Sequence, residues 1–257
     1  MKKYKAKIPA GVQWLAATLV FILSAGHACS GETGGGKITA LLEGAKGKPG
    51  WATGEWSFSM KYDEQTIGFM DVKIEKDGDD YRIVMDSGFE MGGRKHVVKG
   101  EGMMTERLGF LHSERMETTK EGEKETQTVV TGEVRGDILI VSVRENGREV
   151  EIKKIETGGE LYMGFPALIP ALKLLDLDTP GTYTFPVFSA ENRGVVTMSL
   201  MLPGKPVETD AGEGKAKRYI VAAKNAQNTM HFILTGDGEV ERFGPPRTSM
   251  AFVRTVE

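Results

Sequence analysis

Alternation of apolar and polar residues with period two is the feature that most constrains the fold. In EWSFSMKY, residues 55–62, the side chains of Trp56, Phe58, Met60 and Tyr62 fall on one face, with serine and lysine on the other. This pattern predicts a half-buried antiparallel strand. It returns in seven further segments up to residue 155, separated by KDGD, KEGEK, RGD and ENG. Glycine, asparagine and aspartate suit tight hairpins, so an eight-stranded meander is expected.

One segment, Gly164 to Gly181, breaks the alternation. Its sequence GFPALIPALKLLDLDTPG places Leu168, Leu172 and Leu175 at helical spacing, and the proline-glycine pair at its end stops the run. Alternation then resumes in six more segments. We therefore expect one mainly β domain over residues 54–257, an antiparallel meander forming a strongly curved sheet or open barrel, with a single helix, 165–177, between two strand arrays. The halves 54–163 and 182–257 resemble each other loosely, which leaves open both a duplication and the general likeness of amphipathic strands.

The first 28 residues have the three parts of an export signal. Four lysines precede an apolar run of 14 residues, Val12 to Ala25, and small residues follow at Gly26 and Ala28. The run is shorter than the ~20 residues of a membrane span. Cys29 comes next and is the only cysteine, so an intramolecular disulfide is excluded. The glycine-rich residues 29–53 predict a flexible tether.

The tether contains a partial match to a phosphate-binding loop, which the neighbouring residues exclude. The stretch GETGGGK, residues 31–37, spells most of a P-loop, but Ile38 stands where serine or threonine would hold magnesium. No buried strand precedes it either. We therefore expect no nucleotide ligand.

The sequence GHAC, ending at Cys29, resembles the cleavage site of bacterial lipoprotein signals. The resemblance implies lipidation of Cys29 and a membrane anchor in the cell envelope. Because Ser30 is not the aspartate that retains many such proteins in the inner membrane, it implies the periplasmic face of the outer membrane. GHA also fits ordinary signal peptidase, and the alternative is a soluble periplasmic protein.

The remaining chain, Gly54 to Glu257, resembles an uncharacterised β-rich envelope domain of bacteria that sometimes precedes a transglutaminase-like domain. The resemblance lies in IGFMDVKIEKDGDDYRIV, FPALIPALKLLDLDTPGTYTFPVF and MHFILTGDGEVERF. More distantly the chain is similar to LolA and LolB, the periplasmic lipoprotein carriers. These resemblances imply a curved sheet and a lipid or lipoprotein ligand. They transfer no catalytic residue, since the transglutaminase-like module needs a cysteine nucleophile and the only cysteine of this chain is Cys29.

Charge and motifs argue against several functional classes. Without residues 1–28 the chain has 29 basic and 36 acidic residues, a net charge of −7, which argues against nucleic acid as a partner. His96, His112 and His231 each stand alone on a strand pattern, so we expect structural or surface roles and no metal or cofactor. DGDD at 77–80 is expected to be a turn. No G-x-S-x-G elbow occurs, and the prediction is a non-catalytic protein, with a hydrolase as the less favoured alternative.

Methionines are frequent on the predicted strand faces. They either fill gaps in a packed core or line a groove that holds an apolar ligand or a lipoprotein partner. A hollow above roughly 300 Å³ would favour binding. A filled core with an exposed apolar patch would favour a structural or assembly role. The candidate lining residues are Trp56, Phe58, Met60, Phe69, Phe89, Phe185, Met198, Leu200 and Phe232.

Overall fold

The structure is a computed structural model that describes residues 53–210 and 215–255. The predicted export signal, Cys29 and all but the last residue of the predicted tether lie outside the described residues. The fold is mainly β, with one sheet of 16 strands that is antiparallel at all but one of its pairings and does not close. The expected fold class is therefore confirmed.

The first array is an uninterrupted meander in which each strand pairs with the next. Apolar and polar side chains alternate along most of these strands, and tight turns such as Asp77 to Asp80 join them, as predicted. Its strands are β1 Gly54–Tyr62, β2 Gln65–Asp77, β3 Asp80–Met91, β4 Arg94–Met104, β5 Phe110–Glu121, β6 Lys124–Arg135, β7 Ile138–Glu145 and β8 Arg148–Glu156.

The second array follows the helical segment. All six strands expected there are present, and β12 is an addition that the sequence pattern did not indicate because it is only four residues long. The strands are β10 Gly181–Ser189, β11 Gly194–Leu202, β12 Val207–Asp210, β13 Lys215–Lys224, β14 Thr229–Leu234, β15 Val240–Gly244 and β16 Met250–Arg254.

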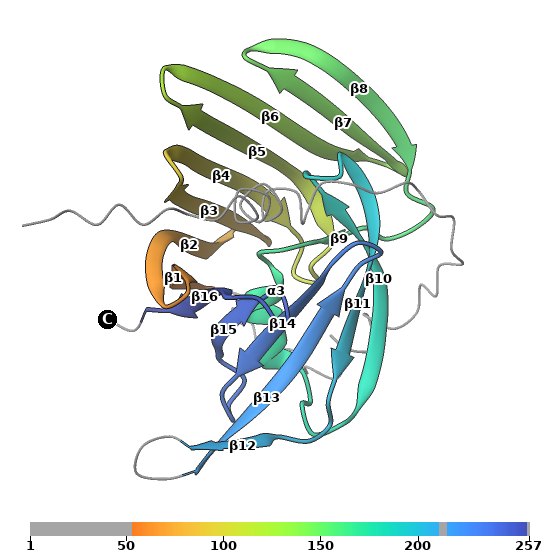
Figure 1. Cartoon of the computed structure of the whole chain (residues 1–257). Helices are drawn as coiled ribbons and strands as arrows, with labels where there is room; N and C mark the ends of the chain where they lie inside the picture. Colours follow the sequence, from red (N-terminus) through yellow and green to blue (C-terminus); the bar gives the residue numbers. More distant parts are fainter. Residues whose placement is uncertain (1–52, 211–214, 256–257) are drawn as a thin grey trace, which may run out of the picture.

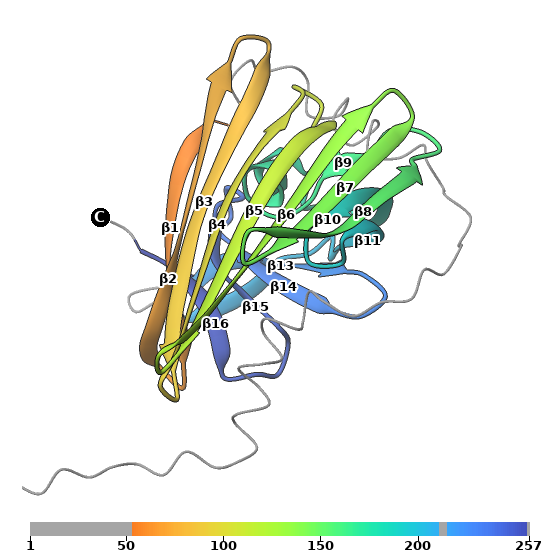
Figure 2. The ribbon, with the colours of Figure 1, turned by 90° about the horizontal axis from the view of Figure 1, so that it is seen from above.

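The two arrays meet where the first and last strands pair. β1 lies between β2 and β16, so the sheet runs from β8 through β1 and β16 to β10 without a break. Figures 1 and 2 show the arrays as two curved walls on either side of the helical segment. A two-residue strand, β9 Tyr162–Met163, pairs in parallel with β10 and also bridges to Gly109 before β5. The inner faces of both arrays therefore look onto a common space.

The helical segment is shorter than expected. We predicted a helix over 165–177, whereas the structure has a four-residue helix, α3 Leu168–Ala171, followed by a single 3₁₀ turn, η1 Leu172–Leu174. Pro170 supplies no backbone N–H, and the chain becomes extended at Leu175. All four residues of α3 are buried, so its predicted packing against the sheet is confirmed. No helix in the described ranges has the length and apolar character to cross a membrane.

Aromatic side chains cluster in the core beneath the seam between β1 and β16. Phe243 stacks on Phe252 with ring centroids 4.6 Å apart and on Phe232 at 5.4 Å. Phe58 meets the same ring edge-on at 5.1 Å. Such aromatic contacts add to the free energy gained by burying the rings. This aromatic cluster lies directly beneath the candidate site.

Candidate functional site

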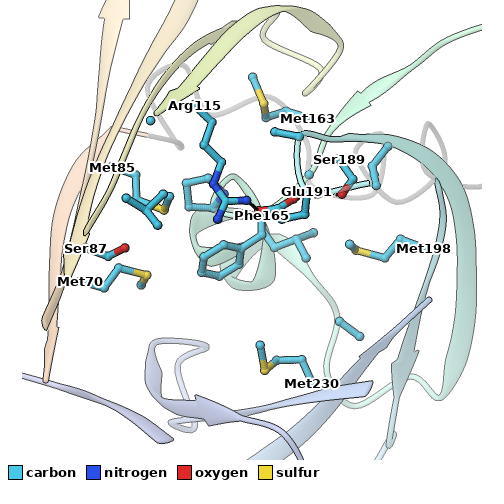
Figure 3. Close-up of a pocket in the computed structure, with 18 of the residues that line it drawn as sticks. Met70, Met85, Ser87, Arg115, Met163, Phe165, Ser189, Glu191, Met198 and Met230 are labelled. Carbon is cyan, nitrogen blue, oxygen red and sulfur yellow. Dashed lines mark hydrogen bonds and ion pairs between the residues drawn. The ribbon is translucent and has the colours of Figure 1, made fainter. Parts of the chain in front are cut away.

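A cavity of about 230 Å³ lies between the two arrays. Strands β1 to β5 supply one wall, β10, β11, β13 and β14 supply the other, and the start of the helical segment closes the back. Figure 3 shows side chains from both walls pointing into this space. The cavity brings together residues from almost the whole described length of the chain.

Six methionines, each from a different strand, line the cavity. Met70 and Met85 project from the first array, and Met198 and Met230 face them from the second (Figure 3). Met60 and Met163 complete the set. Unbranched thioether side chains adapt to apolar partners of different shape, so this lining suits a deformable apolar ligand.

Two glycines of β4 provide room for these side chains. In the antiparallel register Gly100 stands between Met85 and Arg115, and Gly102 stands between Ile83 and Ser113. A Cβ at Gly102 would lie 3.0 Å from the terminal carbon of Met163, closer than most real contacts of this kind. The hollow therefore exists partly because β4 has no side chains at these two positions.

In the structure the predicted lining residues fall into three groups: four that line the cavity, four that are buried around it, and Phe69. Met60, Phe89, Met198 and Phe232 line the cavity. Four others, Trp56, Phe58, Phe185 and Leu200, are buried in the core around it and do not reach it.

Phe69 lies on the outer face, and its prediction as a lining residue is wrong. Its side chain is 44% exposed, because the buried face of β2 is formed by Met70, Val72 and Ile74. Adjacent residues of a strand point to opposite faces, so Phe69 and Met70 cannot both face inward. Because the sequence has an apolar residue on each face at this point, it does not determine which of the two faces the core.

A charged cluster spans the two walls of the cavity. Arg115 of β5 extends into the space and pairs through Nη1 with Glu191, in the turn between β10 and β11 (Figure 3). Its Nη2 lies 3.4 Å from a carboxylate oxygen of Glu117. Ser189 donates a hydrogen bond of 3.0 Å to Glu191. The Arg115 and Glu191 side chains are only 13% and 19% exposed, so the ion pair joins the two arrays in a largely dry environment.

His96 adjoins this cluster and is buried. Its Nδ1 lies 3.0 Å from the Thr119 hydroxyl, and Nε2 lies 3.6 Å from Glu117. Burial, together with the positive charges of Arg115 and Arg94, lowers the pKa of His96 to about 4. Burial also raises the pKa of Glu117. Both shifts favour the uncharged forms of these two side chains.

Sequence reasoning missed Arg115 and Glu191, although β5 contained a usable signal. After Phe110, its positions on the same side as Arg115 are Ser113, Glu117 and Thr119, so the inner face of the strand is polar along most of its length. A strand in the middle of a meander with such a face indicates a polar site. Glu191 had no comparable signal, because it lies in a turn.

Within residues 53–210 and 215–255, no group of three or more His, Cys, Asp or Glu side chains is placed to hold a metal ion. His112 is exposed and His231 is half-buried, each on its own strand. What the cavity offers chemically is a largely apolar space with the Arg115–Glu191 ion pair in its wall and the exposed Lys224 also among its lining residues.

No known protein family, curated protein or solved structure matches this chain.

Proposed function

We propose that this protein is a non-catalytic carrier or receptor of the bacterial cell envelope that binds an apolar ligand between its two strand arrays. One observation carries the proposal: six methionine side chains from six strands surround a space that they do not fill. A core that used methionine only for gap-filling would leave no such space.

The volume limits what can be bound. At about 230 Å³ the cavity is smaller than the roughly 300 Å³ at which small-molecule pockets usually begin. It is nevertheless larger than an engineered apolar cavity of about 150 Å³ that binds benzene. The proposed occupant is therefore one acyl chain, or an apolar group of similar bulk, and the rest of the ligand remains outside.

The proposal includes a location. Lipidation of Cys29 would attach the domain to the periplasmic face of the outer membrane, and cleavage without lipidation would leave it soluble in the periplasm. In either case the ligand would be a lipid or the acylated end of a lipoprotein. Nucleotides and nucleic acids are not expected as ligands, because the net charge is negative.

A fluorescence titration tests the binding proposal. The neutral probe 1-N-phenylnaphthylamine brightens in apolar surroundings, and we expect saturable binding to the wild-type protein. Met198→Trp fills the cavity from β11, whereas Met201→Trp adds the same ring on the outer face of the same strand. We expect a loss of affinity of about tenfold or more for Met198→Trp and none for Met201→Trp.

A second cavity variant provides an independent test in case Met198→Trp does not fold. Ser87→Phe fills the space from β3, on the opposite wall. Thermal unfolding identifies the variants that fold. Unchanged probe affinity in folded Met198→Trp and folded Ser87→Phe would overturn the proposal.

An exposed apolar patch favours a second candidate function, that of a structural or assembly protein acting through its surface. Val150 and Ile152 of β8 are 51% and 56% exposed, and Ile138 of β7 lies on the same face as Ile152. Among the described strands β8 pairs only with β7, so this patch lies at one end of the sheet. A photo-cross-linking amino acid at 152, but not one at Phe69, would then form an adduct in cells.

A further inference from the structure

Two hydrogen-bond donors in the cavity wall have no partner. Five buried side-chain atoms of the described residues lack one, and only two of them, Arg115 Nε and Asn228 Nδ2, belong to residues that line the cavity. Both are donors, and they come from different arrays, since Asn228 lies in the turn between β13 and β14. Native proteins seldom leave buried donors unpaired, so the site is suited to a ligand that supplies acceptor oxygens.

The charge of Arg115 is already balanced. Its two terminal nitrogens face Glu191 and Glu117, and only Nε is without a partner. A ligand carboxylate placed at Nε would add negative charge beside these two carboxyl groups in a poorly hydrated space. Such a group would lose its hydration without gaining an unpaired cation in return. An uncharged acceptor, such as a carbonyl oxygen, meets no such repulsion.

The apolar walls lie on both sides of this donor. Figure 3 shows Arg115 entering the space between Met85 on one wall and Met198 on the other, with Met230 farther along the cavity. A chain lying among the methionines would therefore have its polar end near the guanidinium group. This arrangement matches a molecule with a single chain and an acceptor at one end.

We propose that the cavity binds the acyl chain of an uncharged ester or amide, whose carbonyl oxygen accepts a hydrogen bond from Arg115 Nε. The inference rests on the proposed function and adds the chemical class of the ligand. Asn228 Nδ2 is the second unpaired donor among the lining residues. A free fatty acid, ionised at neutral pH, is discriminated against by Glu191 and Glu117.

The test compares three ligands of equal chain length, methyl laurate, laurate and dodecane, by displacement of 1-N-phenylnaphthylamine at about pH 8. We expect methyl laurate to bind more tightly than dodecane by roughly tenfold or more, the effect of one hydrogen bond from a charged donor. Laurate should bind more weakly than methyl laurate. In Arg115→Lys, which retains a cation beside Glu191 but has no Nε–H, methyl laurate should fall to the affinity of dodecane.

Arg135→Lys is the matched control, because Arg135 is exposed and also pairs with a carboxylate, that of Glu133. This variant should keep the wild-type order of affinities. If Arg115→Lys does not fold, the Nε–H resonance of Arg115 in the wild-type protein provides a second measurement. It should shift on addition of methyl laurate and not on addition of dodecane.

The outcomes separate the inference from the proposed function. If none of the three ligands displaces the probe, the inference fails, and the Met198→Trp titration decides the proposed function separately. If all three displace it equally, the cavity binds apolar chains but the inference is overturned, and Arg115 Nε is hydrated by water only. Tighter binding of laurate than of methyl laurate, or an equal loss for all ligands in Arg115→Lys, would also overturn the inference.

Discussion

Arg115 and Glu191 form an ion pair that connects the two strand arrays across the cavity they enclose. The arginine belongs to the fifth strand of the first meander, and the glutamate belongs to the first hairpin of the second. Their side chains are largely buried, so neither charge is well solvated if the other is removed. The pair is thus part of the cavity wall and a contact between distant parts of the chain.

Glu191→Gln should destabilise the protein. Removal of one partner leaves a buried guanidinium with only Glu117 beside it, and we expect the free energy of unfolding to fall by roughly 2 to 4 kcal/mol. Urea denaturation followed by tryptophan fluorescence measures this. The control is Glu133→Gln, whose exposed pair with Arg135 should make no measurable difference. Equal effects in the two variants would contradict the prediction.

His96 should make stability depend on pH. Because its pKa is lowered from 6.5 to about 4 in the folded protein, the unfolded chain takes up a proton first as the pH falls. The free energy of unfolding should therefore decrease from pH 6.5 down to about 4. Glu117, whose pKa is raised, acts in the opposite direction, since the folded protein takes up that proton more readily.

The variant His96→Asn isolates the contribution of His96. It keeps a polar atom near Thr119 but cannot be protonated, so its stability should fall less than that of the wild type over the same pH range. His112→Asn, at an exposed site on β5, should follow the wild-type profile. Parallel profiles for His96→Asn and the wild type, measured by urea denaturation at each pH, would show the prediction to be wrong.

Gly132→Ala should weaken the packing of the two arrays. A Cβ at Gly132 of β6 would lie 2.6 Å from the ring of Phe188 of β10, which also packs against Phe110. We expect a loss of about 1 to 3 kcal/mol in the free energy of unfolding, as for other overpacked cores. Gly100→Ala, with its nearest contact at 3.6 Å, should be neutral or slightly stabilising. The opposite order of the two variants in thermal unfolding would refute this.

Cys29 should carry the membrane anchor. We expect the mature protein to begin at Cys29 and to bear acyl chains, which together exceed the two-signal requirement for stable membrane attachment. Mass spectrometry of the mature N-terminus in the native host measures this, and Cys29→Ala should release the domain from the membrane fraction. An unmodified Cys29, or another first residue, would leave a soluble periplasmic protein.

The fold was more predictable from the sequence than the site. Alternation along Trp56, Phe58 and Met60 identifies a strand and its inner face, because period two is imposed by the backbone itself. Phe69 and Met70 show where this reasoning ends, since both are apolar and only the sheet decides which is inside. The approach of Arg115 to Glu191 depends on how two distant arrays curve towards each other, and no local pattern contains that information.

The pairing of β1 with β16 also affects the order in which the strand pairs form during folding. Each array consists mostly of hairpins between neighbouring strands, which form quickly because little chain must be brought together. The seam between the arrays joins Phe58 to Arg254, nearly two hundred residues later, so it is the slowest contact to make. Until residues 250–254 arrive, β1 is an open edge able to pair with the wrong chain. Strand β16 therefore completes the cavity: without it the two arrays can form, but the cavity between them cannot.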